Sequence, residues 1–142
     1  MTIIIAIILF LIFLFISSIH IYWAFGGNWG SDAVLPTKDD NNTKVLNPSI
    51  LPTLIVAFGL LGFGLHILII SGLIAFDIPQ WLSNYGLWII ASIFTLRAIG
   101  DFKYVGFFKK IKLTKFGKND TKYYSPLCLT IGILTLILEL IK

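Results

Sequence analysis

Charged residues are scarce in this sequence. Asp, Glu, Lys and Arg together make up 13% of its 142 residues, whereas soluble globular domains carry about 25%. Residues of the set AVILMFWYC make up 57%, and the mean hydropathy is +0.91. A chain of this length has room for one domain and cannot hide so much apolar surface from water. The composition therefore predicts one integral membrane domain over residues 1–142.

Cysteine and the common catalytic motifs are also nearly absent. The single cysteine, Cys128, excludes an internal disulfide and a metal site built from several cysteines. We find no hydrolase, kinase, dinucleotide or zinc motif. The glycine-rich run at residues 59–64 (GLLGFG) lies inside an apolar segment and follows no predicted strand, so it is not expected to bind phosphate. We expect no metal and no cofactor, and no catalytic residue can be assigned.

Four long apolar segments account for most of the chain. They cover about residues 3–25, 50–76, 85–102 and 124–141. A helix needs about 20 apolar residues to cross about 30 Å of hydrocarbon, and helices are expected because an open strand would leave backbone groups unpaired in lipid. The first segment follows no basic residues and precedes no small-residue cleavage site, so we read it as a span, not a signal peptide. The expected fold is an all-α, four-helix membrane bundle.

The lysines lie almost entirely in two connections. Residues 26–49 and 103–123 hold nine of the ten lysines, and with four spans these two connections share one side of the membrane. The positive-inside rule predicts that both are cytoplasmic and that both termini are outside. Residues 103–123 also carry Phe107, Phe108, Phe116 and Tyr123. Beside two spans, this mixture favours contact with anionic lipid headgroups over nucleic acid.

A few ionisable residues fall inside or at the ends of the spans. Arg97 and Asp101 are four apart, which places them on one helix face, and Tyr104 continues that face. The pair could be a structural salt bridge, or Arg97 could bind an anion or polar ligand with its forked donor. His20 lies near Trp23 at the end of the first segment. It could be an interfacial anchor or a proton carrier.

Two further ionisable residues lie deeper, at similar depths. His66 is in the second segment and Glu139 in the fourth. We hypothesise that their side chains approach one another in the outer half of the bundle; the alternative is that both extend to the outer interface. Gly59 and Gly62 share the face of His66, which predicts close packing of that face against another helix.

Three clusters together resemble a known family. They are residues 20–30 (HIYWAFGGNWG), 97–107 (RAIGDFKYVGF) and 120–129 (DTKYYSPLCL). In this order and spacing they are similar to a family of small bacterial membrane proteins catalogued as a domain of unknown function. The resemblance covers nearly the whole chain and implies a four-span protein of the bacterial inner membrane, without an established activity. The residues that match signature positions are His20, Tyr22, Trp23, Gly26, Gly27, Arg97, Gly100, Asp101, Asp120, Ser125 and Pro126. His66 and Glu139 lie outside the pattern.

In the predicted topology all three clusters meet at the cytoplasmic face. We therefore predict one site there, for a small amphipathic or anionic ligand that the protein binds or moves, formed by His20, Tyr22, Trp23, Arg97, Asp101 and Tyr104. A transport version would need a homo-oligomer, because four helices are few for a complete path. The expected partners are membrane lipids and an unidentified small molecule, with no nucleic acid.

Two other functions stay open at the level of sequence. An accessory or structural subunit would show an outward stripe of small residues, for which Ala91, Thr95 and Ala98 are candidates. A membrane enzyme acting on a lipid or quinone-like substrate would use His20 as acid or base, oriented by Asp101. The enzyme ranks last of the three.

Overall fold

The computed structural model of the chain describes residues 1–36 and 49–142, without the side chains of residues 31 and 32. The described residues form helices and contain no strand. The elements are α1 (Thr2–Ala24), α2 (Ser31–Val34), α3 (Ile50–Ile70), α4 (Gln80–Ile99), α5 (Lys115–Asn119), the π-helical turn η1 (Asp120–Tyr124) and α6 (Ser125–Ile141). Half of the predicted connection 26–49, residues 37–48 with Lys38 and Lys44, lies outside the described residues.

Four helices are long and apolar enough to cross a membrane. They are α1, α3, α4 and the continuous helical segment Lys115–Ile141 that joins α5, η1 and α6. Only 22% to 33% of the residues in each span are buried within the protein, and large apolar side chains such as Ile55, Phe58 and Leu96 are exposed. Such surfaces need an apolar solvent. The predicted all-α architecture with four membrane-length helices is confirmed.

The ends of the middle two spans differ from the predicted ones. The helix α3 ends at Ile70, because Gly72 leaves the helical region with φ +80°. The helix α4 begins at Gln80, directly after Pro79, whose missing N–H costs nothing at a helix start. It ends at Ile99, because Gly100 takes φ +86°. The hydropathy pattern alone does not predict these three helix ends, because the backbone conformation at Gly72, Pro79 and Gly100 sets them.

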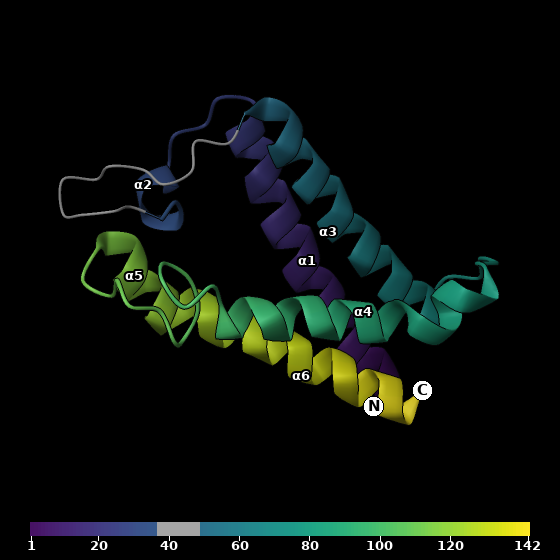
Figure 1. Cartoon of the computed structure of the whole chain (residues 1–142). Helices are drawn as coiled ribbons and strands as arrows, with labels where there is room; N and C mark the ends of the chain where they lie inside the picture. The colour runs from purple at the N-terminus through teal and green to yellow at the C-terminus, as the bar shows by residue number, and fades with distance from the viewer. Residues whose placement is uncertain (37–48) are drawn as a thin grey trace.

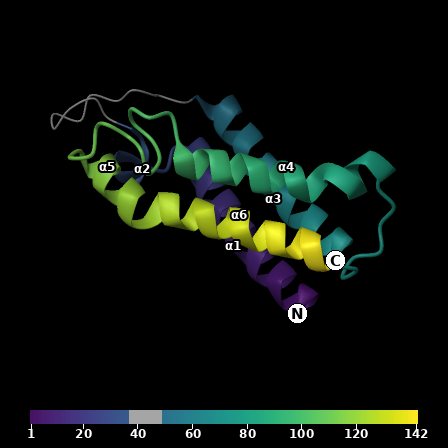
Figure 2. The ribbon, with the colours of Figure 1, turned by 60° about the horizontal axis from the view of Figure 1, so that its bottom comes forward.

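The long helices pack as two pairs that cross each other (Figures 1 and 2). In one pair α1 lies along α3, and the buried hydroxyl of Ser17 donates to the carbonyl oxygen of Ala57 at 2.7 Å. In the other pair α4 lies along α6, where Gly132 allows Thr95 to approach closely. The N- and C-termini lie at the same end of the molecule (Figure 1), as an even number of spans requires.

Aromatic side chains form the junction between the two pairs. The ring of Phe13 in α1 lies edge-to-face against Phe63 of α3 at 6.1 Å and against Phe94 of α4 at 5.3 Å between centroids. Gly64 gives Phe13 room, because a Cβ there would lie 3.3 Å from the Phe13 Cβ. The expected packing at Gly59 and Gly62 is wrong. Both are exposed, and a Cβ at either would meet nothing within 4 Å.

Candidate functional site

The buried carboxylate of Asp120 links several segments at the end of the molecule that carries the lysine-rich residues 103–123. Asp120 has no exposed surface. Its Oδ1 accepts from Arg97 Nη2 at 2.9 Å, and its Oδ2 accepts from the Gly106 N–H at 2.7 Å and the Ser125 hydroxyl at 3.1 Å. The ammonium of Lys109 lies 3.2 Å from the same Oδ2. We call Arg97, Gly106, Lys109, Asp120 and Ser125 the Asp120 cluster.

Lys109 completes this cluster from inside the protein. Its side chain is fully buried, and its Nζ donates to the carbonyl oxygen of Gly106 at 2.9 Å and to the hydroxyl of Thr121. A buried ammonium is tolerated only when it is paired and hydrogen-bonded. Because both oxygens of Asp120 are occupied by protein donors, the cluster joins α4, the following loop, η1 and the start of α6.

Two glycines allow the loop after α4 to close on itself. Gly100 has φ +86° and Gly106 has φ +90°. A Cβ on Gly100 would lie 1.8 Å from the Val105 carbonyl oxygen, and a Cβ on Gly106 would lie 2.3 Å from the Ile99 carbonyl oxygen. The close approach lets the Phe107 N–H donate to the Ala98 carbonyl at 2.8 Å. This turn presents the N–H of Gly106 to Asp120.

Asp101 closes the same turn, which corrects the expected Arg97–Asp101 salt bridge. Its Oδ1 accepts from the backbone N–H groups of Lys103, Tyr104 and Val105 at 2.8 to 3.0 Å. Partial desolvation raises the pKa of this carboxyl, but the hydrogen bonds from those three N–H groups outweigh it and hold the pKa below its ordinary value. Arg97 binds Asp120 instead, because the chain leaves the helix at Gly100 before Asp101 can take its i+4 position.

The first cluster of the sequence ends α1 and shapes the segment after it. Gly26 has φ +93°, its N–H donates to the Trp23 carbonyl, and the Gly27 N–H donates to the Tyr22 carbonyl. This is the glycine-dependent Schellman end of a helix. The Tyr22 ring lies over Gly27, where a Cβ would be 2.3 Å from the ring. The indole N–H of Trp23 donates to the Trp29 carbonyl at 2.9 Å and fixes the returning chain.

His20 is held by its own helix. Its Nδ1 lies 2.8 Å from the Ile16 carbonyl oxygen, and its ring packs edge-on against Trp23 at 5.3 Å. A carbonyl only accepts, so Nδ1 carries the proton in this contact. The role of His20 as an interfacial anchor stays a prediction.

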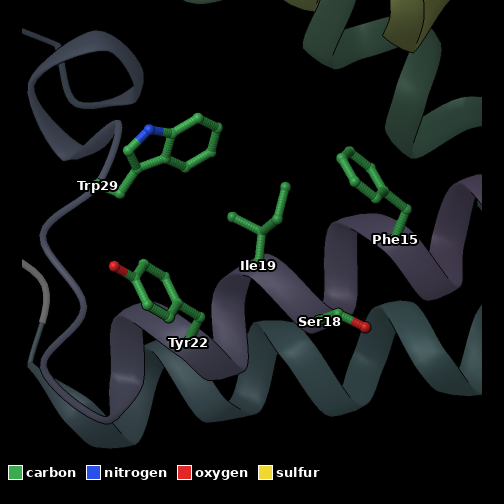
Figure 3. Close-up of a pocket in the computed structure, with 5 residues that line it drawn as sticks. All are labelled: Phe15, Ser18, Ile19, Tyr22 and Trp29. Atoms are coloured by element: carbon green, nitrogen blue, oxygen red, sulfur yellow. The ribbon is translucent and has the colours of Figure 1, made fainter.

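An open apolar pocket lies beside this end of α1. Its volume is about 410 Å³, and Phe15, Ser18, Ile19, Tyr22 and Trp29 line it. Phe15, Ile19 and Tyr22 project from one side of α1, and Trp29 stands above them from the returning chain (Figure 3). The Ser18 hydroxyl donates to the Leu14 carbonyl at 2.7 Å. The lining residues include no charged side chain, so the pocket suits an apolar chain.

The predicted six-residue site does not form as one constellation. Across residues 1–36 and 49–142, no hydrogen bond, ion pair or ring contact joins His20, Tyr22 or Trp23 to Arg97, Asp101 or Tyr104. The end of α1 and the end of α4 lie apart in Figure 1. Tyr104 instead carries the ammonium of Lys103 over its ring at 5.1 Å. Two separate features replace the predicted site: the pocket beside α1 and the Asp120 cluster.

His66 and Glu139 each have immediate contacts of their own. His66 is buried, and its ring packs on Gly86 of α4, where a Cβ would lie 2.1 Å from Nε2. In the described part of the chain neither ring nitrogen has a hydrogen-bond partner. Glu139 pairs with Lys142 at 2.8 Å, and both lie within electrostatic range of His66. The structure therefore shows proximity of charge but no direct His66–Glu139 bond.

Comparison with known families adds one finding. Residues 13–135 match the family described as "Protein of unknown function (DUF3995)". The chain belongs to this family. The match spans α1 to α6 and so includes both the pocket and the Asp120 cluster. No curated protein and no solved structure matches the chain.

Sequence reasoning missed most of the residues that form these two features. Asp120 and Ser125 stood only among the positions of the resemblance, and Lys109 was read as one of several surface lysines. Nothing local marks Lys109 as buried. The pocket residues Phe15 and Ile19 enter the sequence analysis only as apolar content, and Trp29 enters it only as part of the cluster at residues 20–30. A usable signal was the tryptophan and glycine content after α1, which indicates a chain that folds back on the helix.

Proposed function

We propose that the protein is a multi-pass protein of the bacterial inner membrane, with its lysine-rich end in the cytoplasm and both termini outside. The four membrane-length helices and the common end of the two termini support a multi-pass arrangement. The concentration of nine lysines in the two long connections supports the orientation. The family resemblance of the sequence supports the bacterial setting.

We further propose that the protein binds the apolar chain of a small amphipathic ligand in the pocket beside α1. The observation that carries this proposal is the apolar pocket of about 410 Å³ lined by Phe15, Ile19, Tyr22 and Trp29. Ligand sites combine such apolar walls with few polar groups, and here the polar groups are the hydroxyls of Ser18 and Tyr22 and the indole N–H of Trp29.

The lining narrows the class of ligand. An anionic ligand would need a cation in the pocket, and the lining residues supply none. Arg97 and Lys109, which could have served, contact Asp120. An uncharged or weakly polar headgroup near Tyr22 fits better, with its chain along Ile19 and Phe15.

A photoreactive, uncharged lipid tests this proposal. The full-length protein in a phosphatidylcholine bilayer is labelled with a sixteen-carbon fatty alcohol that carries a diazirine, and the labelled peptides are identified by mass spectrometry. We expect labelling of the peptide that holds Phe15 to Trp29. Ile19→Trp fills the pocket and lowers this labelling to the level of the other lipid-facing segments.

The matched control is Ile55→Trp on α3. Ile55 is 63% exposed and lies outside the pocket, so this variant adds the same side chain to a lipid-facing surface and leaves the labelling unchanged. Equal labelling of Phe15–Trp29 in wild type and Ile19→Trp would contradict the proposal.

The other two functions find less support in the geometry. The small residues Ala91 and Ala98 are buried, and Thr95 faces Gly132 of α6, so the predicted outward stripe of an accessory subunit packs within the protein. His20 contacts Ile16, and the Asp101 oxygen that would orient it is bound by backbone N–H groups. An enzyme with His20 as acid or base lacks its acidic partner here.

A further inference from the structure

The segment from Phe102 to Tyr123 carries two kinds of exposed side chain. Its exposed lysines include Lys103, Lys110, Lys112, Lys118 and Lys122. Its exposed large apolar residues are Phe102, Phe107, Phe108, Leu113 and Tyr123. We call these residues together the lysine–aromatic surface. Lys109 is excluded from it, because this lysine is buried against Asp120.

This surface belongs to a folded segment. Asp101 holds the turn at residues 103–105, and the Ile111 N–H donates to the Lys103 carbonyl at 2.9 Å. The Thr114 hydroxyl accepts from the Gly117 N–H and caps α5. With the Asp120 cluster, these bonds fix the backbone that carries the lysines. Little chain entropy is therefore lost when the surface meets a partner.

The segment also keeps a large positive charge. Between residues 100 and 123 there are seven lysines and two acidic residues, Asp101 and Asp120. The carboxylate of Asp101 is bound by backbone N–H groups and that of Asp120 by Arg97 and Lys109. Neither acid is placed to neutralise the exposed lysines, so the surface complements a partner of negative charge.

The position of the surface identifies the partner. The segment directly joins the end of α4 to the start of α6, so its backbone leaves and re-enters the bilayer within it. At that level lysines reach phosphate groups while their methylene stems and neighbouring aromatic rings rest on acyl chains. Phe108 and Leu113 are 64% and 77% exposed. If the partner were soluble, these apolar side chains would stay in contact with water, which is unfavourable.

We propose that the lysine–aromatic surface binds the headgroups of anionic phospholipids in the adjoining leaflet and gathers them around this end of the protein. The proposal is independent of the pocket, because it uses none of the residues that line it. A bilayer with anionic headgroups supplies both the phosphate charge for the lysines and the apolar layer for the rings.

The test compares lipids around the full-length protein in mixed bilayers. Spin-labelled phosphatidylglycerol and phosphatidylcholine are added in turn, and the fraction of each that is motionally restricted by the protein gives a selectivity ratio. We expect the wild type to favour phosphatidylglycerol and to lose that preference at high ionic strength.

Three variants assign the preference to the surface. The quadruple variant Lys110→Gln, Lys112→Gln, Lys118→Gln and Lys122→Gln is expected to lose most of the preference for phosphatidylglycerol. Each lysine contributes a factor of up to about five to the selectivity ratio. The same four positions changed to Arg keep the charge and the preference. The control variant Lys142→Gln removes one positive charge at the opposite end of the spans. It is expected to leave the selectivity ratio near that of the wild type.

Several results would overturn the proposal. These are equal restriction of both lipids by the wild type, an unchanged ratio in the quadruple Gln variant, or a ratio that does not respond to salt. Tight binding of single-stranded DNA without lipid selectivity would also overturn it. The salt dependence of the wild type decides the matter even if the quadruple variant fails to fold.

Discussion

The carboxylate of Asp120 lies inside the protein with a cation beside each oxygen. Arg97 contacts Oδ1, and Lys109 lies near Oδ2. Removing one member of such a group leaves the others buried without compensation, which is more costly than the group's net contribution suggests. The loss of Asp120 would destabilise Lys109 most, because the side chain of Lys109 has no exposed surface through which water could solvate its charge.

We therefore expect Asp120→Ala to destabilise the protein by about 3–5 kcal/mol, the usual cost of breaking a buried ion pair. Asp120→Asn keeps the size and one acceptor oxygen, so it should fall between Asp120→Ala and the wild type. Equilibrium unfolding in mixed micelles, followed by circular dichroism, measures the difference.

Asp77→Asn is the control, because Asp77 is an exposed acid in the connection between α3 and α4. It should unfold with the wild type. If Asp120→Ala were as stable as Asp77→Asn, the Asp120 cluster would not hold this end of the molecule together.

The partner of Arg97 shows how far residue-level prediction reaches. The i, i+4 rule named Asp101 correctly for a continuous helix, but Gly100 ends the helix first. The actual partner, Asp120, is 23 residues away in sequence. Such a pairing depends on how α4 and α6 lie side by side, and no local pattern contains that information. The polar residues could be found from sequence, whereas their partners could not.

At the level of elements, the α4–α6 contact depends on Gly132. A Cβ there would lie 2.6 Å from the Thr95 hydroxyl and 3.4 Å from the Ala91 carbonyl oxygen. Small residues at helix contacts let backbones approach closely in lipid, where packing and not the hydrophobic effect drives association. This approach also brings Arg97 near Asp120.

We expect Gly132→Leu to separate α4 from α6 and destabilise the protein by roughly 1–3 kcal/mol, as overpacking does in other cores. Gly62→Leu on α3 is the matched control, because a Cβ at Gly62 meets nothing within 4 Å. Thermal unfolding in detergent compares the two. Equal melting temperatures for the two variants would argue against close α4–α6 packing.

Element boundaries illustrate what hydropathy can and cannot predict. It located all four spans, because length and apolar content are properties of each segment alone. It extended the second span to residue 76, although Gly72 and Pro79 mark the turn. It also gave no sign that Lys115–Asn119 and the turn Asp120–Tyr124 continue into α6, since polar residues occupy them. The described helix therefore extends beyond the predicted apolar segment.

At the scale of the whole molecule, the two helix pairs and the common end of the termini make the proposed orientation testable (Figure 1). Single cysteines at Lys112 and Lys142 are introduced in a Cys128→Ser background, and intact cells are treated with a maleimide that does not cross the membrane. Because the lysine-rich connections are assigned to the cytoplasm, Lys142→Cys should be labelled and Lys112→Cys protected until the cells are lysed.

Labelling of Lys112→Cys in intact cells with protection of Lys142→Cys would reverse the orientation. Labelling of both would contradict the even number of spans. The Cys128→Ser background alone serves as the unlabelled control.

The distance in sequence between Arg97 and Asp120 has a consequence for the order in which the protein is made. The span α4 has the lowest hydropathy of the four, 1.3, and it carries Arg97 in its last turn. During synthesis this helix is complete before the residues that neutralise it exist, because Asp120 is added 23 residues later. The ion pair that neutralises the end of α4 can therefore form only after the start of α6 has been synthesised.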